Sequence, residues 1–338
     1  MSSNQTAIEV ETAVDRVPDA PGERPVRKTK GPANIILLVL QNRKAAIGAA
    51  ILLFFVILAV FAPWIAPYDP TDFVGKARQA PSSEFWFGTT GSGQDVLSQT
   101  IWGTRVSLAT GLIVGVLTTV IGALIGMSAG YFGGRVDDVL SLFTNVILII
   151  PGIPLLIVLA AFLPAGFVSI VGVLTFTGWA WGARVLRSQT LSLREKDFVS
   201  SAVVSGEGSM RIIFREIFPN MISIVVAGMF GAINYAIGAQ AGLEFLGLGN
   251  PSTVSWGTNL YWAQNNSGLL TGSWWTIIPS GVCIALVAFA LAMVNYAIDE
   301  VTNPRLRSQR QTVALLKRQP RDVRTSRATP VIRQEAGA

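Results

Sequence analysis

The chain has 338 residues, of which 51% are hydrophobic and only 14% are charged, with a formal net charge of +6. An ordinary soluble domain carries about 25% charged residues, so this composition indicates an integral membrane protein. The sequence has no histidine and one cysteine, which excludes an internal disulfide framework and a metal site built from those residues. We expect no catalytic residue, no metal and no cofactor.

The two ends of the chain differ in composition from the rest. Residues 1–33 combine five acidic and five basic side chains with four prolines, which predicts a disordered cytoplasmic tail. Residues 303–338 form a basic tail, also expected to be disordered and cytoplasmic. This tail has no aromatic residue for base stacking, so attraction to membrane lipid headgroups is favoured over nucleic acid, and no nucleic-acid partner is expected.

Between the tails, six apolar runs are each long enough to cross roughly 30 Å of hydrocarbon as a helix. None contains Asp, Glu, Lys or Arg, and all are too long for barrel strands. The predicted fold class is therefore all-α, a polytopic membrane protein with six transmembrane helices. Residues 34–104 hold the first helix and an external loop, and residues 105–302 hold a core domain with the other five. The runs are Ala45–Ile65, Val106–Gly130, Val139–Leu163, Gly166–Ala183, Met221–Leu243 and Trp275–Ile298.

Two of these runs carry residues that modify a helix. In the second run, Gly111, Gly115, Gly122 and Gly126 lie four, seven and four residues apart, which predicts close packing against another helix. The third run contains Pro151, Gly152 and Pro154, which remove or weaken backbone hydrogen bonds. They predict either a bend that lines a pathway or a kink that improves packing.

The distribution of Lys and Arg predicts the orientation. If both termini are cytoplasmic, 21 of these residues lie on the inside near the spans, against three on the outside. The positive-inside rule therefore places both termini, and the loop between the fourth and fifth runs, in the cytoplasm. On the outside, Trp256 stands among turn residues, and either a structural role in a folded loop or contact with substrate fits it.

The spans also limit the mechanism. Secondary transporters and proton pumps generally need ionisable groups within the membrane, and an intramembrane hydrolase needs a nucleophile with a base or a metal. The six runs contain no Asp, Glu, Lys or Arg, and the chain has no His, so ionisable groups and a base for a nucleophile are both missing from the spans. The chain also has no G-x-x-x-x-G-K-[ST] phosphate loop. Passage through this helix bundle must therefore draw energy from another chain.

The cytoplasmic segment Ser205–Asn220 reads SGEGSMRIIFREIFPN and carries an amphipathic pattern. It predicts a short helix with Ser209 as a possible N-cap, ended by Pro219, with arginines on the face opposite an apolar stripe. Either the helix lies flat on the membrane or the same side chains dock in a groove of a partner protein. Periodicity leaves both interpretations open. The stripe consists of Met210, Ile213, Phe214 and Ile217.

The longer stretch FVSSAVVSGEGSMRIIFREIFPN resembles the cytoplasmic loop that marks permease subunits of ATP-binding-cassette importers. That loop reads Glu-Ala-Ala, three residues, Gly, nine residues and Ile-x-Leu-Pro. Here Ser200, Ser201 and Ala202 occupy the first triplet and Gly206 the glycine, and only Ala202 keeps its type within the triplet. Glu216, Ile217, Phe218 and Pro219 occupy the ending, with Glu216 and Phe218 in place of Ile and Leu.

Other stretches resemble the oligopeptide and dipeptide permease subfamily, in its order, over about residues 35–307. Gln94 and Gln240 depart from it, since an arginine and an acid usually stand there. The matching stretches are APWIAPYDP, FWFGTTGSGQDVLSQTIWGTRVSL, AGYFGGRVDDVL, LEFLGLGNPSTVSWG and DEVTNPRLR.

The resemblance implies a type I importer permease (MetI-like) fold in the plasma membrane and a non-catalytic role. It implies four kinds of partner: a second homologous permease, two ATP-binding-cassette ATPase subunits, an external substrate-binding protein and membrane lipid. The loop 195–219 then seats a coupling helix in a cleft of an ATPase. The implied cargo is a di- or oligopeptide. Gln94, Gln240 and Glu244 keep a cello- or xylo-oligosaccharide as an alternative, and a channel or carrier acting alone is the alternative from another class.

Polar residues within the spans are the candidates for lining the pathway. Each can equally hydrogen-bond a neighbouring helix. The candidates are Thr144, Asn145, Asn234, Tyr235, Gln240 and Asn295.

Overall fold

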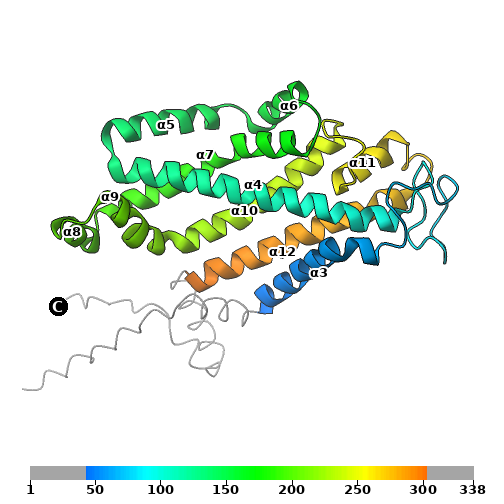
Figure 1. Ribbon diagram of the computed structural model, residues 1–338, viewed down its shortest axis with the longest axis horizontal. Coiled ribbons are helices and arrows are strands. Elements are labelled where there is room, and N and C mark those ends of the chain that lie inside the picture. Colours follow the sequence, from blue (N-terminus) through cyan, green and yellow to red (C-terminus); the bar gives the residue numbers. More distant parts are fainter. Residues whose placement is uncertain (1–42, 303–338) are drawn as a thin grey trace, which may run out of the picture. The chain divides into compact units, whose positions relative to one another are not determined.

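The computed structural model describes residues 43–302 (Figure 1). The two expected disordered tails lie outside the described residues. Within the described range the chain is helical, and its only extended pairing is one isolated antiparallel bridge between Thr89 and Asp95. The prediction of an all-α protein is confirmed for this part of the chain.

The first two helices follow the first two apolar runs. Helix α3 spans Arg43–Ile65, and α4 spans Val96–Phe132, beginning ten residues before the run itself. Asp95 explains this early start, because its carboxylate accepts a hydrogen bond from the backbone N–H of Ser98 at 2.8 Å and caps the helix. At the other end, Gly133 adopts a φ of 66°, a left-handed conformation that glycine adopts readily and that stops the helix.

The third run is not one continuous helix. It forms α5, Gly134–Ile149, and α6, Gly152–Phe162, whose axes are bent by 88°. The cause is local: Ile150 precedes Pro151 and is held in an extended conformation (φ −70°, ψ 129°), as residues before proline usually are. The run Val139–Leu163 thus contains the bend that Pro151, Gly152 and Pro154 predict, and it is sharp enough to divide the run into two helices.

The remaining helices complete the bundle. Helix α7 spans Phe167–Arg194, and α12 spans Ile278–Thr302. Within residues 43–302, five helical stretches are long and apolar enough to cross a membrane, and the bent pair α5–α6 brings the number to six if it counts as one span. The shorter or joined elements are α8 (Asp197–Val204), α9 (Ser209–Arg211), the π-helical η1 (Ile212–Ile217), α10 (Phe218–Phe245), α11 (Trp256–Asn265) and the 3-10 turn η2 (Trp274–Thr276).

Helix α4 is central to the packing, with α7 and α10 against it, while α3 packs along α12 (Figure 1). The glycines of α4 make this approach possible. A Cβ on Gly111 would lie 2.5 Å from Cγ1 of Ile237 in α10, and one on Gly122 would lie 3.0 Å from the carbonyl oxygen of Trp179 in α7. The prediction that this glycine series packs against other helices is therefore confirmed.

The side chain of Trp256 anchors the loop before α11 to the helix bundle. Trp256 is fully buried, its indole N–H donates to the carbonyl of Thr100 at 3.1 Å, and its ring packs edge-on against Phe55 with centroids 5.6 Å apart. Of the two interpretations open for Trp256, the geometry supports the structural one, because a fully enclosed ring cannot contact cargo in this conformation.

Candidate functional site

The first candidate site lies at the end of the bundle where α8 and α9 are found (Figure 1). Helix α8 ends in a Schellman motif: the backbone N–H of Gly206 donates to the carbonyl of Val203 at 3.0 Å, and that of Glu207 donates to the carbonyl of Ala202 at 3.1 Å. This motif requires a left-handed residue at its turn, and Gly206 has a φ of 78°. The glycine of the loop pattern is thus the stop signal of α8.

Helix α8 itself holds the first triplet of that pattern. Ser200 and Ser201 are exposed and Ala202 is half-buried. The two following valines, Val203 and Val204, are also exposed, and Val204 is 88% accessible. Sequence reasoning missed α8 because it has only eight residues, but a glycine shortly after the run AVV was the available signal for a helix end.

The segment after Gly208 differs from the expected short amphipathic helix. Gly208, rather than Ser209, is the N-cap, and no side chain caps this end. The helix does not end at Pro219 but runs without interruption from Ser209 to Phe245. A proline ring clashes with the carbonyl four residues earlier in a regular helix, and the wider π-helical turn Ile212–Ile217, which ends two residues before Pro219, gives the ring room.

The π turn also changes which side chains face outward. The expected stripe is divided: Ile213 and Ile217 are buried, whereas Met210 and Phe214 are exposed. Ile212 is also buried. In a π helix each backbone N–H bonds to the carbonyl five residues earlier, as the bond from the Phe218 N–H to the Ile213 carbonyl shows. Residues five apart, such as Ile212 and Ile217, therefore lie on the same face. The buried isoleucines form one apolar cluster with Val199 of α8, Met127 of α4 and Leu186 of α7. The isoleucines therefore connect α8 to the bundle.

The second candidate site is a cavity of about 700 Å³ between α4, α7 and α10, which Leu148 of α5 and Asn295 of α12 also border. Two of the proposed pathway residues, Tyr235 and Asn295, line it, and Trp181 contributes a second aromatic ring. The Oδ1 atom of Asn295 is buried and has no hydrogen-bond partner among the described residues. The other lining residues are apolar, small or hydroxyl-bearing, and none carries a charge.

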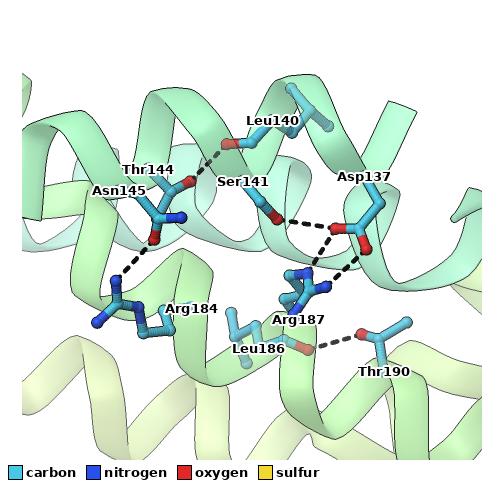
Figure 2. Close-up of polar contacts among 9 residues, drawn as sticks. All are labelled: Asp137, Leu140, Ser141, Thr144, Asn145, Arg184, Leu186, Arg187 and Thr190. Atoms are coloured by element: carbon cyan, nitrogen blue, oxygen red, sulfur yellow. Dashed lines mark hydrogen bonds and ion pairs between the residues drawn. The ribbon is translucent and has the colours of Figure 1, made fainter. Parts of the chain in front are cut away.

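Two other pathway candidates lie elsewhere, between α5 and α7 (Figure 2). The hydroxyl of Thr144 donates to the Leu140 carbonyl at 2.8 Å, and Asn145 Oδ1 accepts a hydrogen bond from Arg184 at 2.7 Å. One turn away, Arg187 makes a bidentate ion pair with Asp137, at 2.5 and 2.6 Å. Asp137 and Arg187 are 50 positions apart in sequence, and no local pattern pointed to their pairing.

Gln240 belongs to a buried polar cluster where α10 ends and α11 begins. It is 1% accessible and donates from Nε2 to Glu244 Oε1 at 3.0 Å, while the hydroxyl of Ser255 donates to Glu244 Oε2. Ser255 also accepts from the Thr258 N–H and so caps α11. This cluster fixes the loop between the two helices. Asn234 is half-buried and does not border the 700 Å³ cavity.

The arrangement defines a class of protein: a polytopic helical membrane protein with a neutral cavity and an exposed apolar turn at one end. Residues 122–308, more than half of the chain, match the family described as binding-protein-dependent transport system inner membrane component. Residues 39–81 match the N-terminal TM domain of oligopeptide transport permease C. The chain therefore belongs to this family of permease subunits of ATP-binding-cassette importers.

Curated relatives match along most of their length. The oligopeptide transport system permease protein OppC of Bacillus subtilis (strain 168) is 32% identical over 270 residues, covering 79% of this chain and 87% of that protein. The dipeptide transport system permease protein DppC of the same organism is 31% identical and covers 79% and 83%. DppC of Haemophilus influenzae is 30% identical and covers 79% and 92%.

Proposed function

We propose that this chain forms half of the translocation pathway for di- or oligopeptides, with a second homologous permease forming the other half. The names of its relatives, which are oligopeptide and dipeptide permeases, support this cargo class. An external substrate-binding protein delivers the cargo. Two ATPase subunits hydrolyse ATP, and the chain described here contributes no catalytic residue.

The observation that carries the proposal is the set of exposed apolar side chains at the α8 end of the bundle, which we call the coupling surface. It comprises Val203, Val204, Met210 and Phe214. Large apolar side chains left exposed beside water are typical of surfaces that a partner covers. In the proposed orientation these side chains face the cytoplasm, where an ATPase subunit seats α8 in a cleft.

The packing beneath the coupling surface suits the transmission of a displacement. Helix α8 contacts the buried isoleucines of η1, and these belong to a helix that continues unbroken to Phe245. That helix borders the 700 Å³ cavity through Tyr235. Closure of the ATPases around α8 therefore moves a continuous rigid element that reaches the cavity wall, and the permease pair rocks between inward-facing and outward-facing states.

The role of the coupling surface can be tested by uptake in proteoliposomes that contain this chain, its second permease, the ATPases and the binding protein. We expect ATP-dependent accumulation of labelled di- and oligopeptides. Val204→Asp should abolish uptake and lower ATPase recovery with the permease, because a charge replaces the most exposed valine of the surface. Ser200→Asp, on the same short helix at an exposed polar position, is the control. Normal uptake by Val204→Asp would contradict the proposed contact.

The uncharged cavity favours oligosaccharides as a second candidate cargo. Trp181 and Tyr235 provide aromatic faces, and hydroxyl groups such as that of Thr118 provide hydrogen bonds, which together suit sugar rings. Competition with cello- and xylo-oligosaccharides in the same assay separates the two cargo classes. Inhibition by sugars and not by peptides would replace the peptide assignment, whereas the reverse result would reject the sugar.

A channel or carrier that acts alone is the alternative from another class. Purification in mild detergent distinguishes it from the importer. We expect ATPase subunits to be recovered with the chain, and transport to stop when those subunits cannot hydrolyse ATP. Transport by the purified chain without them would reject the proposal.

A further inference from the structure

Beyond the proposed transport role, we propose that the pocket between α4, α5 and α7 binds the phosphate group of an anionic phospholipid. The pocket has a volume of about 170 Å³. Polar side chains from α5 and α7 border it, namely Ser141, Thr144, Asn145, Arg184 and Arg187 (Figure 2). Small residues of α4 and α7, Gly126, Ala129 and Ala183, border it as well. Its volume is below the 300–1,000 Å³ or so of ordinary small-molecule sites, and it suits a headgroup rather than a peptide.

The charges at this pocket leave one cation without a counter-ion. Asp137 neutralises Arg187 through the bidentate pair. Arg184 makes its hydrogen bond to the neutral amide of Asn145, and it has no carboxylate partner among the described residues. Asp138, the exposed neighbour of Asp137 on α5, also interacts electrostatically with Arg187. Arg184 is therefore the side chain at this pocket that is available to bind an anion.

The position of Arg184 along its helix indicates where that anion comes from. Arg184 stands 17 residues after the first residue of α7, Phe167, which corresponds to roughly 25 Å at 1.5 Å per residue. The hydrocarbon core is about 30 Å thick, so the guanidinium lies close to its boundary, where lipid phosphates are found. A basic pocket between transmembrane helices at this depth is suited to an anionic headgroup. In the proposed orientation this is the cytoplasmic leaflet.

Asn145 prepares the guanidinium for this ligand. Its Oδ1 atom accepts one N–H of Arg184 and holds the side chain at the pocket, while its Nδ2 atom remains as a further donor. The remaining N–H groups of Arg184 can bind two phosphate oxygens side by side. This geometry explains why an arginine pairs with a neutral amide here while its neighbour one turn away pairs with an acid.

Native mass spectrometry of the purified full chain tests the site. It is titrated with phosphatidylglycerol and with phosphatidylcholine of identical acyl chains. We expect tighter binding of phosphatidylglycerol, and we expect Arg184→Gln to weaken it about ten-fold, as loss of a charged hydrogen bond implies. Arg194→Gln is the matched control, because Arg194 is exposed on the same helix and does not border the pocket. Arg184→Lys retains the charge and should retain part of the preference.

Four outcomes would overturn the proposal. One is equal binding of the two lipids by the unchanged protein. Another is an equal loss in Arg184→Gln and Arg194→Gln, which would indicate a diffuse positive surface. The third is displacement of phosphatidylglycerol by inorganic phosphate or glycerol phosphate, which would indicate a site for a small soluble anion. If Arg184→Gln unfolds at the same temperature as the unchanged protein, its weaker lipid binding is a direct effect of the lost side chain and not of misfolding. Unchanged phosphatidylglycerol binding by Arg184→Gln would likewise overturn the proposal, whereas a transport defect of the unchanged protein that still prefers phosphatidylglycerol would count against the proposed function and not against this site.

Discussion

At the scale of single residues, Gly206 shows how one backbone angle determines the shape of the coupling surface. The exposed valines of α8 are followed directly by the turn that this glycine makes, with a φ of 78°. A side chain at position 206 meets no neighbour within 4 Å, so space is not the constraint. The left-handed conformation itself costs other residues about 1–2 kcal/mol.

We therefore predict that Gly206→Ala lowers ATP-driven uptake through strain in the turn, and that Gly206→Asp abolishes it because it also places a charge beside the coupling surface, while insertion and expression remain normal. The substitution strains the turn and shifts α8 relative to its ATPase. Gly208→Ala is the control, because Gly208 also has open space around it but an ordinary φ of −69°. The measurement compares uptake with the amount of protein in the membrane. Equal uptake by the two alanine variants would show that the conformation of this turn is unimportant for coupling.

A second prediction at this scale concerns the pair of Asp137 and Arg187, which joins α5 to α7 beside the bend. Asp137→Asn removes the anion and leaves a partly buried arginine without its partner. We expect a loss of about 1–3 kcal/mol of stability, the usual range for a hydrogen bond to a charged group. Thermal unfolding in micelles measures it. Asp138→Asn, at the exposed neighbouring position, should have little effect, and similar losses in both variants would contradict the structural role of the pair.

At the scale of elements, η1 places neighbouring residues on opposite faces. Ile213 is 3% accessible and belongs to the apolar cluster that includes Val199, whereas Phe214 is 52% accessible and belongs to the coupling surface. We predict that Phe214→Asp abolishes transport while the protein stays folded in the membrane. Ile213→Asp should instead reduce the amount of folded protein, because it buries a carboxylate without a partner. Membrane abundance and uptake, measured together, separate the two effects. Loss of folded protein in both variants would reject this division.

The elements also show where sequence reasoning succeeds. Long apolar runs without charges specify helices because a backbone in lipid must satisfy its hydrogen bonds internally, and the run ending at Ile65 became α3 as expected. The bend at Pro151 also has a local cause. Reasoning from a 3.6-residue period fails at η1, because a π turn shifts the phase of every following side chain and moved Ile213 from the expected outer stripe into the core.

The candidate site was less predictable than the fold for a related reason. The glycine of the loop pattern is visible in the sequence, but its role as the stop of α8 depends on backbone angles. The neutral cavity depends on packing between α4, α7 and α10, which brings Thr118 and Tyr235 to one space although 117 positions separate them. Long-range pairs of this kind arise from helix packing and leave no local signature.

At the scale of the whole molecule, the orientation of the chain in the membrane decides whether the coupling surface faces the compartment that contains ATP. The positive-inside rule predicts that the α8 loop is cytoplasmic, because that orientation gives 21 Lys and Arg residues inside near the spans against three outside. In the proposed orientation the loops before α4 and α11 lie outside, on the side where the proposed binding protein would deliver cargo. The two ends of the molecule must therefore differ in their access to a reagent that does not cross the membrane.

Single cysteines can test this orientation. Cys283 is the only native cysteine, so Cys283→Ser gives a background without thiols. In that background, Ser92→Cys and Ser205→Cys place a thiol at an exposed position before α4 and after α8, respectively. We predict that a membrane-impermeant maleimide labels Ser92→Cys in intact cells and labels Ser205→Cys only after the membrane is permeabilised. The Cys283→Ser background without an added cysteine is the control for labelling elsewhere. Labelling of Ser205→Cys in intact cells would place the coupling surface outside, where no ATPase can reach it, and would reject the proposed coupling.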